Sequence, residues 1–282
     1  MYLHIAIITR YGPASLNHGQ KQGNLSLLQK AQLGEAEHSF VSGSCIRRGL
    51  RDSLQEQGYT TNQKIDPTTG SVTYESESCD GKTYTDIDLF GNAVLQSHLR
   101  RLGPTQVTPG ISLKPYTNET AFCTRSVQNR DSNSLFHIEF HTTRYGYCVT
   151  VKVDDLIIPS RIFGLINAVM NIGRVGGHGN VFSYDFSPES FICRWTKTPQ
   201  PMIQYAFDVE DSSQKTVVIK EQIMEEIFSE EIPSQELWIS GPVARGLSLG
   251  KAHIDCHRKN TIQQLKERIS QDLDIPLPPP IS

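Results

Sequence analysis

Hydrophobic and polar residues along the chain form short blocks that predict buried strands and amphipathic helices. Residues 2–9, YLHIAIIT, are almost uninterruptedly apolar, which is typical of a buried strand. Residues 135–143, 147–154 and 191–197 are also rich in β-branched and aromatic residues and predict three more strands. Only Arg144-Tyr145-Gly146 separates the first two of these, which predicts a tight hairpin.

Helical periodicity occurs in two places between these strands. A helix is expected to begin at Ser42, a good capping residue, and to end near Gly58. A second helix is expected over 159–172, with proline in its first turn and apolar residues at helical spacing. Further pieces are expected as a short helix near 89–102, strands at YAFDV and LWISG, helices near 220–228 and 261–272, and an extended tail, IPLPPPIS.

The order of these elements predicts an α+β fold. Strand, helix, insertion, strand, strand, helix and strand follow one another, which is the split ferredoxin-like order βαββαβ of RNA-recognition modules. Residues 1–58 then form the first half of a palm and 131–198 its second half. Residues 59–130 are a polar, turn-rich insertion, expected to order partly on a partner, and 199–282 are additions that end in the proline-rich tail.

The composition is that of a soluble globular protein. The 282 residues are 37% hydrophobic and 20% charged, with a net charge of −3. No apolar run approaches the roughly 18 residues of a membrane-spanning helix, and the first residues do not have the pattern of a signal peptide. The six cysteines are scattered without a C-x-x-C pair, which favours a reduced, cytoplasmic protein without a membrane partner.

The net charge hides a segmental pattern. Residues 58–90 carry two basic and six acidic residues, 91–130 carry five basic and one acidic, and 199–250 carry three basic and nine acidic. Such blocks are either solvated faces or the opposite faces of molecules that stack head to tail, and the sequence leaves both open.

Three arginines gather at the start of the first predicted helix. At about 100° per residue, Arg47, Arg48 and Arg51 share one arc beside an apolar stripe, and Asp52 and Glu56 lie outside that arc. Like charges at this spacing repel unless an anion covers them. The arc is either a solvated face or a phosphate-binding surface, because arginine forks match phosphate oxygens.

The segment before this helix supplies further donors. Residues 17–24, NHGQKQGN, are expected to be a loop whose glycines permit close backbone approach and whose amides and Lys21 can donate hydrogen bonds. No Gly-Lys-Ser/Thr follows, so a Walker loop is excluded, and a plain connector remains the alternative.

Two other nucleotide-binding patterns are incomplete. The cluster GRVGGHGN at 173–180 follows a helix and precedes a strand, the reverse of a dinucleotide fingerprint, but a close approach to RNA or to a neighbouring subunit stays open. RYGYCVTV at 144–151 is similar to the aromatic motif of RNA-recognition modules. Tyr145 and Tyr147 are displaced by one position, so we do not expect them to stack on bases.

The sequence gives little support for a metal site or for a catalytic nucleophile. His253, Cys256 and His257 lack a second ligand pair at zinc spacing, so no metal is expected there. Asp86 and Asp88 are interpreted as turn and capping residues, although two acids can also hold a cation. No nucleophile elbow or triad spacing occurs, and we expect no cofactor.

Five blocks of the sequence together resemble one family. They are SLNHGQKQGNLS, VSGSCIRRGLRDSL, TDIDLFGNAV, PTQVTPGISLKPY and RVGGHGNVFSYDFSPESF, in that order between residues 15 and 191. This set resembles the DevR-type backbone subunit of type I CRISPR effector complexes (Cascade), of the RAMP superfamily. Residues 199–282 match only by position.

The resemblance implies a hand-shaped protein with an RNA-recognition palm, fingers at 59–130 and a thumb placed with the additions at 199–282. Several copies of such a protein polymerise head to tail along one guide RNA, which pairs with one strand of target DNA. The implied partners are the large, small, guide 5′-end-capping and guide-processing subunits and, in some relatives, transposition proteins.

The resemblance also implies which residues contact the RNA backbone. They are Asn17, His18, Gly19, Lys21, Ser42, Gly43, Arg47, Arg48 and Arg51, with Gly176, Gly177 and His178 as a second, weaker group. From the charge blocks, Arg100 and Arg101 are expected at a subunit interface, against the acidic residues 208–236 of the next copy.

Catalysis is not expected. Type III relatives cut RNA with an aspartate between the first strand and the first helix, where residues 17–44 carry only Glu35 and Glu37 as acids. The chain is therefore interpreted as a non-catalytic scaffold. The alternative is a metal-dependent or histidine-assisted RNA nuclease, suggested by nine histidines and by Asp86 and Asp88.

Overall fold

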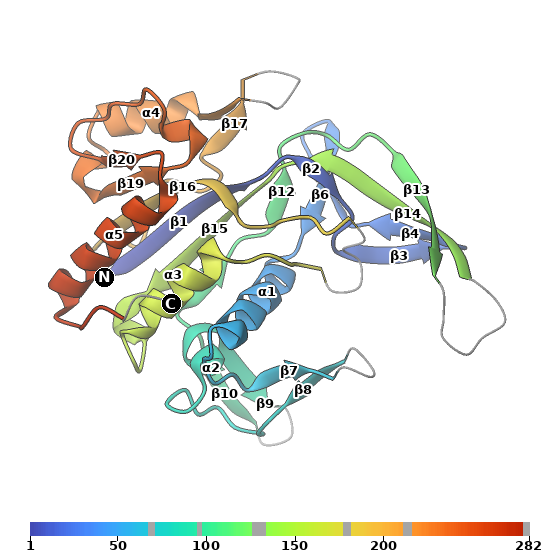
Figure 1. The fold of residues 1–282 in the computed structure, drawn as a ribbon, viewed down its shortest axis with the longest axis horizontal. Coiled ribbons are helices and arrows are strands. Elements are labelled where there is room, and N and C mark those ends of the chain that lie inside the picture. The colour runs from blue at the N-terminus through green and yellow to red at the C-terminus, as the bar shows by residue number, and fades with distance from the viewer. Residues whose placement is uncertain (67–70, 95–97, 126–133, 177–181, 211–215, 279–282) are drawn as a thin grey trace.

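The computed structural model describes residues 1–66, 71–94, 98–125, 134–176, 182–210 and 216–278 (Figure 1). Helices and strands are mixed along the chain, which confirms the α+β class. The α-helices are α1 (Gly43–Glu56), α2 (Thr85–Phe90), α3 (Arg161–Met170), α4 (Glu221–Phe228) and α5 (Arg258–Leu273).

A large sheet forms the centre of the molecule. Its strand order is β20 (His253–Asp255), β19 (Leu237–Ser240), β16 (Pro188–Thr196), β1 (Tyr2–Thr9), β15 (Tyr145–Lys152), β12 (Gly110–Ser112), β6 (Ala36–Val41) and β5 (Lys30–Leu33), and β11 (Thr105–Val107) also pairs with β15. The first strand lies in the middle and pairs antiparallel with both neighbours, with Ile5 opposite Val149 and Cys193.

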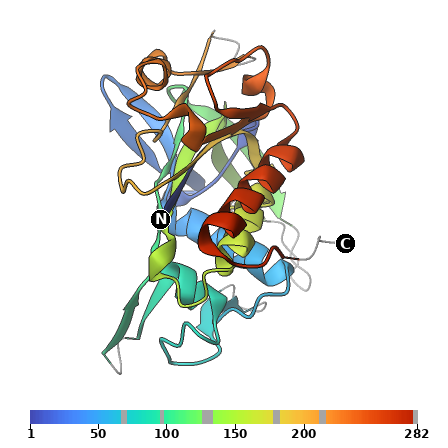
Figure 2. The same ribbon diagram turned by 90° about the vertical axis from the view of Figure 1, so that its left-hand side faces the viewer.

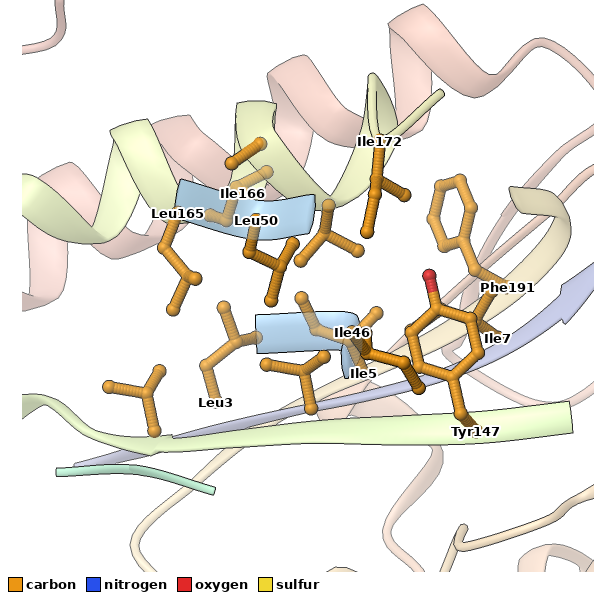
Figure 3. Close-up of a cluster of buried hydrophobic side chains, with 14 of the residues drawn as sticks. Leu3, Ile5, Ile7, Ile46, Leu50, Tyr147, Leu165, Ile166, Ile172 and Phe191 are labelled. Carbon is orange, nitrogen blue, oxygen red and sulfur yellow. The ribbon is translucent and has the colours of Figure 1, made fainter. Parts of the chain in front are cut away.

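Burial on both faces explains why β1 is apolar at nearly every position. One face carries Leu3, Ile5 and Ile7, which lie in one hydrophobic cluster with α1, α3 and α5 (Figure 3). The other face carries Ala6 and Ile8, which lie in a second cluster with β17 (Phe207–Val209), β18 (Val217–Ile219) and α4. The large sheet is therefore covered by α1, α3 and α5 on one side and by β17, β18 and α4 on the other.

A second sheet extends from this centre (Figure 1). It contains β13 (Glu119–Arg125), β14 (Ser134–Thr143), β4 (Leu25–Leu28) and β3 (His18–Gln22), with β2 (Gly12–Ala14) paired to the end of β14. Two small hairpins, β7–β8 (Gln63–Ile65, Val72–Tyr74) and β9–β10 (Gly91–Val94, Leu99–Leu102), lie with α2 below α1.

The loop expected over residues 17–24 is wrong. These residues form the β3–β4 hairpin, which turns at Gly23 with a φ of 60°, and five strands rather than a loop separate β1 from α1. The strands are short and polar, and their partners lie far along the chain, as where His137 pairs with Leu25. Local periodicity therefore did not reveal them.

The hairpin expected around Arg144 is also wrong. In the described part of the chain, β14 pairs with β13, β4 and β2, whereas β15 belongs to the large sheet. Arg144 lies at the crossing between the two sheets, where it donates to the carbonyl of Thr9 at 3.1 Å and forms an ion pair with Glu189. The two strands are adjacent in sequence but not partners.

The described residues within the polar region 59–130 form more secondary structure than the one short helix expected there. The helix expected near 89–102 is wrong, because α2 ends at Phe90 and the β9–β10 hairpin follows. The strands β11 and β12 return to the large sheet, beside β15. Among the described residues, no helix has the length and apolar character needed to span a membrane.

Candidate nucleic-acid interface

The first helix begins without an acidic residue in its first turn. Ser42 caps it as expected, and its side chain accepts a hydrogen bond from the amide of Cys45 at 3.2 Å. The first residues, Gly-Ser-Cys-Ile, carry no acid, so the positive end of the helix dipole is not neutralised by its own turn. Such a terminus suits a phosphate or another anion.

Three predicted segments meet beside this terminus. Gly176 has a φ of 96°, and a Cβ there would lie 3.3 Å from the amide nitrogen of Asn17. The backbone of Gly176 forms a hydrogen bond with the thiol of Cys45. Burial is the main effect on the pKa of this thiol and raises it. Asn17 donates from its side chain to Gln29 at 2.6 Å and to the carbonyl of Phe40 at 3.3 Å. The fold thus brings together residues from three separate sequence blocks.

A buried carboxylate anchors the β3–β4 hairpin next to them. Glu139 accepts hydrogen bonds from the amide of Leu28 at 2.8 Å and from the ammonium of Lys30 at 2.9 Å. Lys30 also lies 4.2 Å from the ring centroid of Tyr116. Because the base of the hairpin is fixed, Lys21 is held on an exposed edge strand.

His18, at the start of this hairpin, is half-buried. One ring nitrogen lies 2.9 Å from the hydroxyl of Ser15, which in turn donates to the carbonyl of Glu139 at 2.7 Å. Burial lowers the pKa of His18, and the nearby charge of Glu139 opposes that effect. The neutral imidazole is therefore favoured, so His18 can contribute a hydrogen bond more readily than a charge.

The arginine arc is divided by its surroundings. The side chain of Arg51 is 13% exposed, with its Nε 3.5 Å from the carboxylate of Asp86 and its guanidinium 4.9 Å from the ring centroid of Phe90. Burial lowers its pKa, and Asp86 opposes that effect. The side chain of Arg51 is therefore held by contacts within the fold, which its position on the helix did not indicate.

The other two arginines are both partly buried but differ in their contacts. Arg48 pairs with Asp52 at 2.5 Å, so an acid does neutralise part of the arc, contrary to expectation. Its Nε and Nη1 are buried without a hydrogen-bond partner among the described residues. Arg47 makes an exposed hydrogen bond to the hydroxyl of Ser44 at 3.1 Å. Arg47 is thus the arginine of the arc most available to a ligand.

The predicted glycines differ in role. A side chain at Gly43 would clash with the carbonyl oxygen of Val107, so this glycine lets α1 approach β11 closely. Gly19 is exposed on β3, next to the side chain of Gln29. Gly177 and His178 lie outside the described residues.

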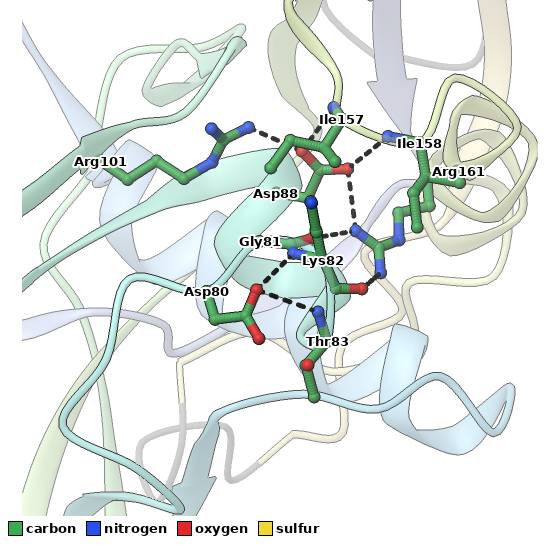
Figure 4. A network of polar contacts seen from close by, with 9 residues as sticks. All are labelled: Asp80, Gly81, Lys82, Thr83, Asp88, Arg101, Ile157, Ile158 and Arg161. Carbon is green, nitrogen blue, oxygen red and sulfur yellow. Dashed lines mark hydrogen bonds and ion pairs between the residues drawn. The ribbon is translucent and has the colours of Figure 1, made fainter.

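Arg101 forms an ion pair inside its own chain. It donates to the buried carboxylate of Asp88 at 2.7 Å, which also accepts from Arg161 at 2.9 Å and from the amides of Ile157 and Ile158 at 2.9 and 3.2 Å (Figure 4). This network joins α2 and β10 to the start of α3. Arg100, on the same strand, is exposed.

The second acid of the pair is engaged in a similar way. Asp86 accepts hydrogen bonds from the amides of Asn62 and Gln63 at 2.8 and 3.1 Å. Asp86 and Asp88 are therefore buried carboxylates that accept hydrogen bonds from backbone amides, which agrees with their interpretation as turn and capping residues. Among the described residues, no group of three or more histidine, cysteine or acidic side chains is arranged to hold a metal ion.

The tyrosines and histidines considered from the sequence as base-stacking and zinc-binding residues make other contacts in the structure. Tyr145 and Tyr147 are buried in the large core, and Tyr147 stacks on Phe186 at 5.1 Å, so neither is available to a base. His253 stacks on Trp238 at 4.9 Å, and His257 contacts Asp255 at 2.9 Å.

Sequence reasoning missed Gln29 and Cys45. Gln29 holds Asn17 in place, and the thiol of Cys45 meets the backbone at Gly176. Neither residue carries a motif, since both contacts join segments that only the folded chain brings together.

Comparison with known proteins identifies the family. A Myxococcus xanthus (strain DK1622) protein described as "CRISPR-associated protein Cas7/Cst2/DevR" is 31% identical over 272 residues, which cover 88% of this chain and 89% of the relative. The chain belongs to the Cas7/Cst2/DevR family of CRISPR-associated proteins. No family model matches the sequence.

Two chains of solved structures have a similar fold. A chain of a "CRISPR RNA-guided surveillance complex, pre-nicking" is similar with a TM-score of 0.65 at 10% identity, covering 94% of this chain and 99% of that chain. A chain of a "CRISPR RNA-guided surveillance complex" has a TM-score of 0.62 at 13% identity, covering 96% and 100%. At these identities the likeness shows a shared fold alone.

Proposed function

We propose that this Cas7 family member is a non-catalytic, guide-RNA-binding backbone subunit of a type I CRISPR effector complex (Cascade). The observation that carries the proposal is the similarity to the Cas7/Cst2/DevR protein over nearly the whole length of both chains. Several copies line one guide RNA, and the guide pairs with one strand of target DNA, so base pairing rather than the protein reads the sequence.

The large sheet supports a palm of the split ferredoxin-like type. Its centre has the order β16, β1, β15, β12, with the first strand between the third and fourth strands of a βαββαβ unit. In this proposal β12 is the second palm strand, and residues 59–104 form the fingers. The sheet of β13, β14, β4 and β3 is the thumb because it extends from the centre (Figure 1). Residues 199–282 are then additions to the palm.

The contacts of α1 and the β3–β4 hairpin favour one phosphate-binding surface. Lys21 is exposed on β3, and Arg47 is partly exposed on α1. Gly176 approaches both Asn17, next to β3, and Cys45 in the first turn of α1, so these two elements come together at this glycine. Arg48 forms an ion pair with Asp52, and we assign it as a second phosphate contact. We assign Arg51 to the fold instead, because its guanidinium is packed against Asp86 and Phe90.

A nuclease role has less support than a scaffold role. The carboxylates of Asp86 and Asp88 are occupied by backbone amides and arginines, so both would have to abandon these contacts to hold a metal ion. Partners would be the guide RNA, the paired DNA strand, further copies of the chain and the other Cascade subunits, in the cytoplasm. Recruitment of transposition proteins remains one option for such a complex.

Guide binding is tested by titrating a labelled guide-like RNA at several salt concentrations. Replacing Lys21 and Arg47 by glutamine should weaken binding and flatten the plot of log affinity against log salt by up to about 0.7 per lost phosphate contact. Arg245→Gln, an exposed substitution on the far additions, is the matched control. An unchanged slope in a folded double variant would contradict the surface. Specific cleavage of a guide precursor in Mg²⁺ would contradict the scaffold role.

A further inference from the structure

A groove opens between α3, α5 and the C-terminal residues. It has a volume of about 840 Å³, and its walls come from Asn167 on α3, Lys259, Ile262 and Lys266 on α5, and Leu277 after it. The volume is in the range of about 300–1,000 Å³ typical of ligand sites.

The groove is rich in positive charge that the fold does not neutralise. Among the described residues that line it, none is acidic, whereas Arg258, Lys259 and Lys266 are cationic. Arg258 donates to the carbonyl of Pro188, and the ammonium of Lys266 contacts the side-chain oxygen of Asn167 at 2.6 Å. Half-burial lowers the pKa of Lys266. A carboxylate entering the groove would therefore meet cations that have no acidic partner in the described lining, one of which, Lys266, is half-buried.

Apolar groups beside these cations indicate a protein ligand rather than single-stranded nucleic acid. Ile262 is buried at the base of the groove, and Leu277 is 40% exposed at its edge. The described lining contains no aromatic side chain on which a base could stack. An acidic helix with one apolar anchor fits this combination, because helix-in-groove recognition uses residues at i, i+4 and i+7.

The chain itself carries such a helix. On α4, Glu221, Glu225 and Phe228 follow the spacing i, i+4, i+7 and share one exposed face, while Ile223 and Ile227 are buried in the core. Phe228 is 68% exposed, which is unusual for a large aromatic side chain. Within the described part of the chain, neither glutamate forms an ion pair.

We propose that the basic groove of one copy receives the acidic face of α4 from the next copy, with Phe228 against Ile262 and Leu277. In Figure 2 the orange helix α4 lies at the upper left and the C-terminal residues lie at the right, so the helix cannot fill the groove of its own copy. A contact between two different surfaces of identical chains repeats head to tail. The inference rests on the proposed assembly of several copies, and it names the elements that join them.

This contact replaces the pairing expected for Arg100 and Arg101. Arg101 is committed to Asp88 inside its own chain, so it is not free to meet the acidic residues of a neighbour. In the proposed contact, the glutamates of α4 instead meet the cations of the groove, whose described lining contains no acidic residue. The segmental charge pattern of the sequence then reflects an interface, but with a different basic partner.

The test uses two charge-reversed variants of the full chain, studied by analytical ultracentrifugation without RNA and on an RNA long enough for several copies. One carries Lys259→Glu and Lys266→Glu in the groove, and the other carries Glu221→Lys and Glu225→Lys on α4. Each should fail to associate with itself, because like charges then face each other. Mixed, they should associate again as an alternating head-to-tail assembly, since the acidic groove of one variant then faces the basic α4 of the other, and the unchanged groove faces the unchanged α4.

Three further variants test whether this particular contact joins the copies. Phe228→Ala should weaken the wild-type association by at least tenfold, and Lys251→Glu, an exposed reversal outside the groove, should leave it unchanged. Lys259→Glu alone serves if the half-buried Lys266 proves necessary for folding. The proposal is overturned if the two charge-reversed variants fold and each still associates with itself like wild type. It is also overturned if their mixture stays monomeric.

Binding to a short RNA, long enough for one copy, distinguishes the two proposals. If the groove variants lose this binding and the mixture does not associate, the groove is a nucleic-acid site and the contact between copies is wrong. If wild type binds no RNA but the mixed variants still pair, the contact stands and the guide-binding function fails. A wild-type protein that stays monomeric both alone and on the long RNA also overturns the contact.

Discussion

Arg161 donates a hydrogen bond at 2.9 Å to the Oδ2 atom of Asp88, and this contact ties the first turn of α3 to α2 (Figure 4). The two residues are 73 positions apart in the chain, and the side chain of Asp88 is completely buried. Since Arg101 shares the same carboxylate, one aspartate holds the region below α1 against the palm helices.

Removing this carboxylate should destabilise the protein strongly. Asp88→Ala leaves two arginines and the amides of Ile157 and Ile158 without their acceptor, and we expect the free energy of unfolding to fall by about 3–5 kcal/mol. Urea denaturation followed by circular dichroism measures this. Asp80→Ala, at an exposed carboxylate that caps Lys82 nearby, should change the midpoint far less. Equal effects of the two substitutions would show that the network is not the determinant.

Stability should also fall in mild acid because of His141. Burial lowers the pKa of His141 to about 4, with His38 adding to the effect and Glu119 opposing it. The unfolded chain binds a proton near pH 6.5, so stabilisation is complete above that pH and is lost as the pH falls toward 4. The contribution of this residue should decrease by roughly 2 kcal/mol between pH 7.5 and pH 5.

The measurement compares urea midpoints of wild type and His141→Gln at the two pH values. The variant lacks the titrating ring, so its midpoint should fall less between pH 7.5 and pH 5 than that of wild type. The ring nitrogen lies 2.7 Å from the hydroxyl of Ser39, and glutamine retains a polar group there. Parallel pH profiles for the two proteins would assign the acid sensitivity to other groups.

Local signals predicted the elements whose causes are local. Ser42 caps α1 as expected because a capping side chain acts within three residues. The strand β1 was recognised from its apolar run, and α3 from its helical spacing. The break after Arg144 could not be predicted in this way, because strand order depends on partners such as β13 and β4, which are distant in the chain.

The candidate site shows the same division. Helical geometry placed Arg47, Arg48 and Arg51 on one arc, but only the folded chain separates an exposed arginine from one packed against Asp86. The approach of Gly176 to Asn17 likewise joins two blocks that no pattern linked. Residue types were therefore readable from the sequence, whereas their availability to a ligand was not.

The start of α1 should tolerate no side chain at Gly43. A Cβ there would clash with the carbonyl oxygen of Val107, so Gly43→Ala should shift the helix and destabilise the protein by about 1–3 kcal/mol. Gly173→Ala is the control, because nothing lies within 4 Å of its Cβ position. Thermal unfolding of both variants decides the point, and a wild-type midpoint for Gly43→Ala would show that α1 and β11 can separate without cost.

Arg47 and Arg51 should respond in opposite ways to the same substitution. Arg51→Gln removes a guanidinium that lies 3.5 Å from the carboxylate of Asp86 and against Phe90, so it should lower the urea midpoint. Its effect on the salt dependence of RNA binding should be small. Arg47→Gln removes a partly exposed charge whose hydrogen bond to Ser44 is exposed, so the midpoint should stay within experimental error of wild type while the salt slope flattens by about 0.7.

Both readouts are needed for each of these variants, since a loss of RNA binding alone would not separate contact from folding. Binding is measured by anisotropy of a labelled RNA between 50 and 200 mM salt, roughly the range over which phosphate contacts change affinity most visibly. If Arg51→Gln flattens the slope and leaves the midpoint unchanged, its guanidinium leaves Asp86 to meet the phosphate. The RNA surface would then extend across the whole arginine arc rather than end at Arg48.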